Sequence, residues 1–146
     1  MDVDTGVSLV SHPVRACRRR VQREHESIVD GIDYCADAVS ESWDDDSVAD
    51  RRHVVEPMQS ALESAGILER LPVVLSDAVE AAGYELPATP VASPPYVVLT
   101  SRGPLCRATV EPGRILIRFD AFSVSRTPEP VYRRRDGVQV SVSLES

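Results

Sequence analysis

The chain has 146 residues, of which 42% are hydrophobic and 27% charged, a balance typical of a globular domain and not of a disordered chain. Its formal net charge of -7 argues against general nucleic-acid binding through a positive surface. All sixteen basic residues are arginine, and no stretch approaches the roughly 18 apolar residues that a transmembrane helix requires.

The first predicted element is one long amphipathic helix over residues 14–43. At about 100° per residue, nine mostly apolar side chains fall within an arc of about 80°. These side chains are Val14, Cys17, Val21, His25, Ile28, Ile32, Cys35, Val39 and Trp43. Ser11 and Pro13 indicate where the helix begins, and the polar run at 42–47 predicts the loop that ends it. The resulting stripe must be covered by the rest of the chain.

Two short helices and a connector are predicted next. Pro57 offers a first-turn residue for the second helix, which Gly66 can close, and Pro72 and Gly83 bracket the third in the same way. Residues 87–95 contain four prolines and form an extended connector without helix. The helical half therefore covers residues 1–86, and the β half covers residues 96–146.

The β half begins with predicted strands at 96–101 and 105–111. If Pro112-Gly113 is a two-residue turn, Val110 faces Ile115, Ala108 faces Ile117 and Cys106 faces Phe119, all on one side. On the other side the same register sets Arg107 directly opposite Arg118 and leaves Leu105 and Leu116 exposed.

Two further features are predicted toward the C-terminus. The alternation of apolar residues shifts by one after Phe119, which indicates a β-bulge at Asp120-Ala121. A last hairpin is predicted with Arg135-Asp136-Gly137 as its loop, so that Val140 faces Tyr132. A two-residue turn is disfavoured there, because it would set valines against arginines.

The predicted fold is a single α+β domain over residues 1–146. A three-helix half packs on one face of an antiparallel meander of four to five strands, because the sheet alone would leave its valines and isoleucines uncovered. Two separate domains are the weaker alternative, since each would be small. Residues 1–86 hold 8 arginines against 18 acidic side chains, a net charge of -10, and residues 87–146 hold 8 against 5, a net charge of +3.

Catalytic and metal-binding patterns are missing from the sequence. The histidines and the three cysteines show no close pairing of ligand type, so we expect no metal and no cofactor. Cys17, Cys35 and Cys106 are an odd number at unrelated spacings and predict buried thiols without a disulfide. No nucleophile motif or phosphate loop is present, and Asp44-Asp45-Asp46 is interpreted as a solvated run. We therefore assign no catalytic residue and do not favour an enzyme.

Arginine clusters are the candidate binding residues. Arg15, Arg19 and Arg23 crowd the start of the predicted long helix, where the helix dipole disfavours positive charge. Arg107 and Arg118 form a like-charge pair in the predicted register, and an anionic ligand would relieve it. The favoured alternative is that these arginines pair with carboxylates of the helical half or of a second subunit.

Three stretches resemble a family of small haloarchaeal proteins of unknown function: Val-Val-Glu-Pro-Met at 54–58, Leu-Pro-Val-Val-Leu at 71–75 and Ser-Pro-Pro-Tyr-Val-Val-Leu-Thr at 93–100. The acidic, lysine-free composition also looks like that of proteins from salt-rich archaeal cytoplasm. The resemblance implies a lineage and carries over no active site. Asp2 and Asp4, without an apolar run, predict no signal peptide, so we expect a cytoplasmic protein.

Two functions remain open. The favoured one is an interaction or structural module, in which the sheet meets another protein or a second copy through its outer face or a free strand edge. The other is a module that binds an anion or nucleic acid through the arginines. The shortage of aromatic residues near either cluster disfavours nucleic acid as the ligand.

Overall fold

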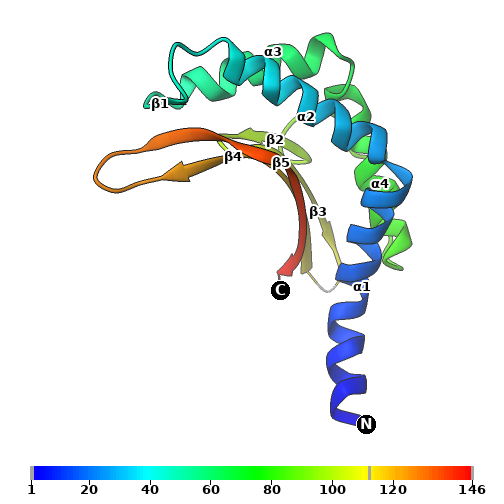
Figure 1. Cartoon of the computed structure of the whole chain (residues 1–146). Helices are drawn as coiled ribbons and strands as arrows, with labels where there is room; N and C mark the ends of the chain where they lie inside the picture. The colour runs from blue at the N-terminus through cyan, green and yellow to red at the C-terminus, as the bar shows by residue number, and fades with distance from the viewer. Residues whose placement is uncertain (1, 112, 146) are drawn as a thin grey trace.

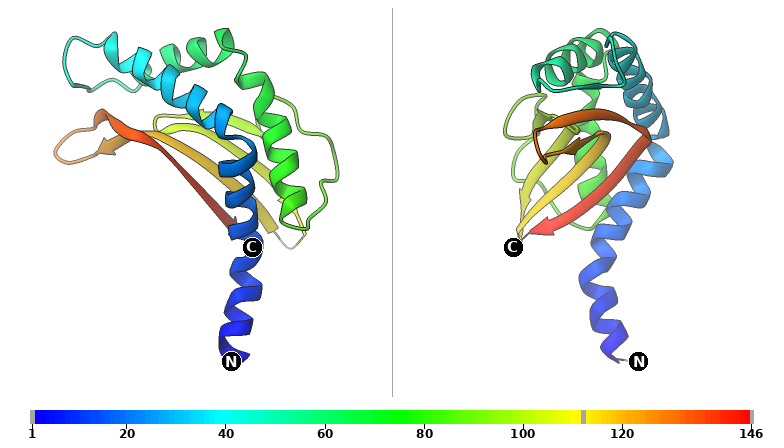
Figure 2. Two further views of the ribbon diagram at one scale, coloured as in Figure 1. Left: turned by 45° about the vertical axis from the view of Figure 1, so that its right-hand side comes forward. Right: turned by 60° about the vertical axis from the view of Figure 1, so that its left-hand side comes forward.

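In a computed structural model, residues 2–111 and 113–145 are described, with side chains from His12 onward. The described residues form four α-helices and a five-stranded antiparallel sheet in the order β1-β5-β4-β3-β2. The sheet is strongly bent; the helices lie along its convex side, and its concave side faces away from them (Figure 1; Figure 2). The predicted α+β class, with helices before strands, is confirmed.

The elements follow one another in this order: α1 Asp2–Glu24, α2 Glu26–Glu41, β1 Ser47–Val48, α3 Arg52–Ser64, the 3-10 helix η1 Leu68–Arg70, α4 Leu71–Ala81, β2 Val97–Thr100, β3 Gly103–Val110, β4 Gly113–Ser125 and β5 Val131–Glu145. Only β1 comes from the helical half, in a segment that was predicted to be a loop. It adds a short strand beside Tyr132 and Arg133 of β5.

The prediction of one long helix is wrong, because α1 and α2 are separate. His25 lies between them in a non-helical conformation (φ -124°, ψ 31°), and the chain changes direction there (Figure 1). The predicted stripe is nevertheless buried on both sides of the break, at Cys17, Val21, Ile28, Ile32, Cys35 and Val39. A straight helix could not follow the bend of the sheet, whereas two helices keep one stripe against its convex side.

Two predicted helix starts lie too late in the chain. α1 begins at Asp2 with Pro13 inside it, and α3 begins at Arg52 with Pro57 inside it. Pro57 has no N–H for the carbonyl of His53, one turn back. The indole N–H of Trp43 donates to that carbonyl instead (3.0 Å), so the proline does not end the helix.

The predicted helix ends and the connector are confirmed. Gly66 and Gly83 follow α3 and α4 with positive φ angles of 72° and 89°, a conformation that glycine adopts without strain. Residues 87–95 form neither helix nor strand.

The predicted register of β3 and β4 is wrong by two residues. Val110 faces Gly113, Ala108 faces Ile115 and Cys106 faces Ile117. A shift of two keeps every side chain on its predicted face, so the alternation of apolar residues could not distinguish the two registers. The partners do change: Arg107 faces Leu116, and Arg118 faces Leu105, so the two arginines are not directly opposite each other.

The β-bulge predicted in β4 is confirmed, since the pairing with β5 shifts between Asp120 and Phe122. The N–H groups of Ala121 and Phe122 both donate to the carbonyl of Arg102, at 2.7 and 3.0 Å. Two N–H groups on one acceptor let β4 bend there without leaving a backbone donor unpaired.

The predicted last hairpin is wrong, because Arg135-Asp136-Gly137 lies inside the continuous strand β5. These residues bulge out between Arg134, which faces Phe122, and Gln139, which faces Asp120. Val140 consequently faces Phe119 and not Tyr132. Residues 126–130 connect β4 to β5 instead, and their two prolines keep them out of the ladder.

Arg134 fills the bulge from within. Its Nη1 donates to the carbonyls of Ala121 (3.0 Å), Arg135 (2.8 Å) and Gly137 (3.2 Å). Its Nη2 donates to the Asp33 carbonyl (3.0 Å) and pairs with the Asp33 carboxylate, and its Nε donates to Asp37 Oδ1 (3.2 Å). One guanidinium therefore binds both strands at the bend and joins them to α2.

One apolar cluster links the helices to the convex face of the sheet. The cluster includes Ile32, Met58 and Leu75 from the helices and Ile117 and Phe119 from β4, all fully buried. Leu105 and Leu116 lie outside this cluster, on the other face of the sheet.

Candidate functional site

The concave face of the sheet carries three arginines, Arg107, Arg114 and Arg118, which we call the arginine face. The core residues of β3 and β4 alternate with them, so these side chains leave the sheet away from the helices. Arg114 and Arg118 flank Leu116 along β4, and Arg107 lies opposite that leucine on β3. The pairing therefore places three positive charges within a few residues of one another on an uncovered face.

Two leucines form the apolar floor between these arginines. Leu105 and Leu116 are only 9% and 6% exposed, so the prediction that both are exposed is wrong. Each faces an arginine across the strands, Arg118 and Arg107 respectively. The methylene stems of arginines cover apolar neighbours while their guanidinium groups stay in water, which accounts for the burial.

The arginine face has few internal partners. The Nε of Arg107 donates to the Pro95 carbonyl (3.1 Å), which fixes that side chain and leaves its terminal amino groups available. In the part of the chain that the structure describes, none of the three guanidinium groups forms an ion pair, whereas Arg20, Arg52 and Arg134 all do. Strand pairing sets Glu145 opposite Arg114, so one carboxylate lies on the same face.

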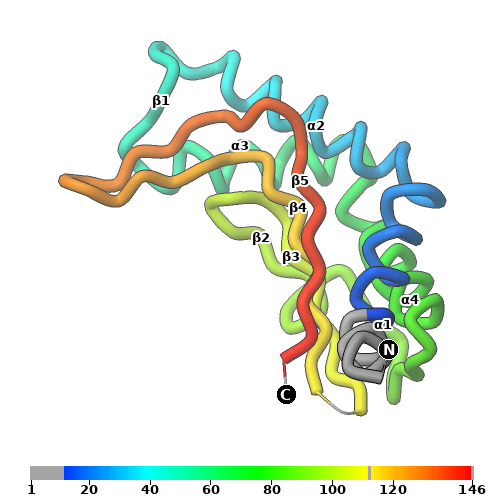
Figure 3. Tube along the Cα trace, turned by 60° about the horizontal axis from the view of Figure 1, so that its bottom comes forward, coloured from blue at the N-terminus to red at the C-terminus, as the bar shows by residue number. Residues whose placement is uncertain are grey.

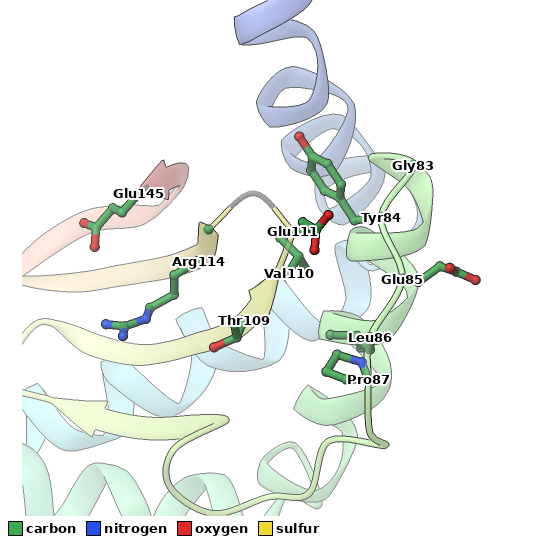
Figure 4. A pocket seen from close by; sticks show the side chains of 11 residues that line it. Gly83, Tyr84, Glu85, Leu86, Pro87, Thr109, Val110, Glu111, Arg114 and Glu145 are labelled. Carbon is green, nitrogen blue, oxygen red and sulfur yellow. The ribbon is translucent and has the colours of Figure 1, made fainter.

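A cleft of about 1140 Å³ lies beside this face, between the end of the β3–β4 hairpin and residues 83–87 (Figure 4). Figure 4 shows Arg114 and Thr109 pointing to the same side of the hairpin. Three carboxylates, of Glu85, Glu111 and Glu145, also line the cleft. This larger space is thus not uniformly positive and does not by itself favour an anion.

A smaller adjoining cavity of about 260 Å³ is different, and we call it the arginine pocket. It is lined by Leu86, Pro87, Pro95, Tyr96, Arg107, Ala108, Thr109 and Arg114. Its lining residues include two arginines and one aromatic residue, and none of them is acidic. The arrangement can bind a phosphate or carboxylate through Arg107 and Arg114 while an apolar part of the ligand contacts Tyr96.

The other predicted arginines lie elsewhere. Arg15, Arg19 and Arg23 are exposed on α1, on the convex side of the sheet, so the structure does not bring them together with Arg107 and Arg118. The reason for predicting a ligand there also disappears. Because α1 begins at Asp2, these arginines occupy its second half, and Arg23 lies in the last turn, where the helix dipole favours positive charge.

An ion-pair cluster on the convex side uses another α1 arginine. Arg20 Nε lies 2.7 Å from Asp77 Oδ2, and the same oxygen is 2.7 Å from His25 Nε2. The hydrogen bond from Arg20 is the largest effect on Asp77 and lowers its pKa below the ordinary 3.8. Burial of the carboxylate raises the pKa, and the contact with His25 lowers it. The cluster ties α1 to α4 beside the helix break and leaves no free guanidinium for a ligand.

Sequence reasoning missed Arg114 and Tyr96. The alternation Arg114-Leu116-Arg118 on β4 was a usable signal, because residues two apart share a face. Tyr96 lies directly before β2, and its carbonyl accepts from the Arg107 N–H (2.8 Å), so the predicted strand at 96–101 was a usable signal once that strand is paired with β3.

The cysteines are buried and free, as predicted. Burial raises the pKa of both Cys17 and Cys106 to about 12, so each stays a protonated thiol at neutral pH. Among the side chains described, those of residues 12–111 and 113–145, no three or more histidines, cysteines or acidic residues gather as a metal site would require. None of the described helices combines the length and the apolar character that crossing a bilayer takes.

Fold and site together define a small α+β protein with helices on the convex side of a bent antiparallel sheet and arginines on its concave side. The chain matches the family described as Domain of unknown function (DUF7988) over residues 15–145, and it belongs to that family. Comparison with curated proteins and with solved structures found no match in either set.

Proposed function

We propose that this protein is a binding module whose arginine pocket holds the anionic group of a ligand. The observation that carries the proposal is the pair Arg107 and Arg114, which line one cavity without an ion-pair partner in the described chain. Arg107 and Arg114 are diagonal neighbours on β3 and β4, close enough for one ligand to reach both side chains. A bound phosphate or carboxylate would supply a negative charge in the pocket, because Glu145, opposite Arg114 on β5, forms no ion pair with it.

The chemistry of the pocket favours a planar or tetrahedral anion with a small apolar part. Arg107 is held by the Pro95 carbonyl through Nε, so its terminal amino groups are preorganised. Guanidinium groups bind phosphate and carboxylate oxygens in pairs, which gives both strength and orientation. Tyr96, Leu86 and Pro87 offer an apolar wall for the rest of the ligand.

The test compares two charge-matched double variants. Inorganic phosphate, and separately a short single-stranded oligonucleotide, are titrated into the wild type, into Arg107→Gln/Arg114→Gln and into Arg15→Gln/Arg19→Gln. We expect the pocket variant to lose at least about tenfold in affinity, since hydrogen bonds to charged groups are the strong ones. The control, which removes the same net charge from α1, keeps wild-type affinity. Equal binding by all three proteins would refute the proposal.

Salt dependence distinguishes a small anion from a polymer. Oligonucleotide binding through several phosphate contacts weakens steeply as salt rises, whereas one anionic group on two arginines gives a shallow slope. We favour the small ligand, because Tyr96 is the single aromatic residue of the pocket.

A protein-interaction or structural module is the second candidate. Exposed leucines no longer support it, because Leu105 and Leu116 are buried. The supporting observation is instead the unpaired edge of β5, since β1 covers only Tyr132 and Arg133 of that strand.

We also propose that the protein comes from a haloarchaeal cytoplasm. The support is its composition, with a net charge of -7 and no lysine. An acidic surface keeps a protein soluble in concentrated salt. Thermal unfolding should then shift upward as KCl is raised to molar concentrations, and a midpoint that falls or stays constant would count against this origin.

A further inference from the structure

The C-terminal half of β5 is an edge strand. β1 pairs with β5 only at Tyr132 and Arg133, so in the described chain residues 139–145 pair on one side alone, with β4. Figure 3 shows this part of β5 running down to the C-terminus with β4 on one side and no other strand on the other. The edge is seven residues long, which exceeds the typical strand length of about 5–6 residues.

The direction of the free backbone groups follows from the ladder. The N–H of Arg107 donates toward β2, to the Tyr96 carbonyl (2.8 Å), and backbone groups alternate in direction along and across antiparallel strands. Leu116 therefore bonds toward β5, and its partner Ser143 bonds back toward β4. The alternate residues of β5, Val140, Val142 and Leu144, present their N–H and C=O groups outward.

This edge lacks the side-chain protection against pairing that edge strands usually carry. Natural edge strands carry lysine, proline or inward charges that block a neighbouring strand. Residues 139–145 contain neither lysine nor proline, and their inward side chains are valine, valine and leucine. Val140 is buried and joins the core, whereas Val142 and Leu144 are half-buried at its border. Pairing along this edge would cover both.

We propose that two copies of the chain pair antiparallel through this edge, about a two-fold axis at Val142. Among the registers that join outward-facing residues, this one aligns the whole of 139–145. Val142 then meets Val142 of the partner subunit, and Val140 meets Leu144 of the partner subunit. About six backbone hydrogen bonds form, and the two sheets become continuous.

Side-chain charges fit the same register. Glu145 is the charged residue of the edge, and it faces the partner's Gln139, while Ser141 faces the partner's Ser143. No like charges are opposed. The edge also belongs to the half of the chain with a net charge of +3. The inference does not depend on the proposed anion site.

The test is the mass of the full chain by light scattering over a concentration series at ~0.2 M KCl, where charge effects are still felt. We expect a dimer that dissociates on dilution. Gln139→Glu sets two acids opposite each other at both ends of the interface and should raise the dimer dissociation constant about tenfold. Adding Glu145→Gln removes the opposed charges and should restore the wild-type value.

A backbone variant tests the hydrogen bonds themselves. Val142→Pro removes an outward N–H that β4 does not use, so it should abolish the dimer while far-UV circular dichroism stays native. Val142→Ile keeps the N–H and serves as its control. A wild-type chain that is monomeric throughout, or a dimer unaffected by Gln139→Glu, overturns the inference even if the proline variant fails to fold.

Discussion

Arg134 at the bend and the arginine face lie on the same sheet, yet they use positive charge in opposite ways. Arg134 is 13% exposed and donates to three strand carbonyls and to two aspartates of α2. The side chains of Arg107, Arg114 and Arg118 form one hydrogen bond in total, from Arg107 to the Pro95 carbonyl, and no ion pair in the described chain. Arginine in this β half therefore has a structural role where the sheet bends, and it is available to bind a ligand where the concave face of the sheet is uncovered.

The largest expected effect comes from breaking the bend at Arg134. Arg134→Met leaves the Ala121, Arg135 and Gly137 carbonyls and the Asp33 carboxylate without their donor. Each buried acceptor left without a donor costs about 1–3 kcal/mol, whereas Asp33 and Asp37 are 42% and 56% exposed and their ion pairs contribute less. We expect the free energy of unfolding in urea to fall by about 3–5 kcal/mol, mainly through the three carbonyls. Arg134→Lys should rescue little, because an ammonium group lacks the planar fork. A loss under about 1 kcal/mol would show that contacts other than those of Arg134 stabilise the bend.

Gly103 gives the next effect, because it is where β3 crosses close to the bulge of β4. A Cβ at Gly103 would lie 2.0 Å from the Phe119 carbonyl oxygen, at a φ of 141°. Gly103→Ala should cost about 3 kcal/mol, since backbone atoms must move. Gly83→Ala is the matched control: its φ of 89° is also positive, but nothing lies within 4 Å, so about 1 kcal/mol is expected. Equal losses in urea melts would mean that the contact with Phe119 is unimportant.

Asp77 should give a smaller and pH-dependent effect. The pKa of Asp77 lies below its ordinary 3.8 because of Arg20, so the carboxylate stabilises the fold fully above pH 3.8 and less as the pH falls toward its folded pKa. Thermal melts of wild type and Asp77→Asn should therefore differ at pH 6 and converge in acid. Parallel curves down to pH 2 would show that this ion pair does not contribute.

The smallest effect on stability is expected at the arginine face. Arg114 is exposed and has no ion pair in the described chain, so Arg114→Gln should change the free energy of unfolding by less than about 0.5 kcal/mol. The same substitution should still weaken phosphate binding about tenfold. A destabilisation comparable to that of Arg134→Met would contradict the distinction between structural and available arginines.

Local patterns could be predicted from the sequence. The stripe from Cys17 to Val39, the ends at Gly66 and Gly83, and the bulge after Asp120 each depend on a few adjacent residues, and all are observed. The break at His25 was invisible because the stripe continues through it. The register of β3 and β4 was missed because a shift of two preserves both faces.

Long-range partners could not be predicted. Arg134 and Asp33 are 101 residues apart in the chain, and no periodic pattern links them. An Asp136-Gly137 pair is typical of a hairpin turn, yet here it lies in a bulge that Arg134 holds. For the candidate site, the face of Arg107 and Arg118 followed from alternation, whereas the pocket with Arg114 and Tyr96 required the pairing of β2 with β3 and the path of the connector.

The bond between Trp43 and the His53 carbonyl has a practical consequence. Trp43 is the sole tryptophan of the chain, and its ring lies 5.9 Å from that of Phe122 on β4. Its fluorescence therefore reports on one place, where the end of α2 and the start of α3 meet β4 at Phe122. Detachment of the helical layer should change the emission of Trp43, whereas ligand binding at the distant end of the β3–β4 hairpin should not. The tryptophan signal can therefore distinguish unfolding of the helical layer from binding at the hairpin.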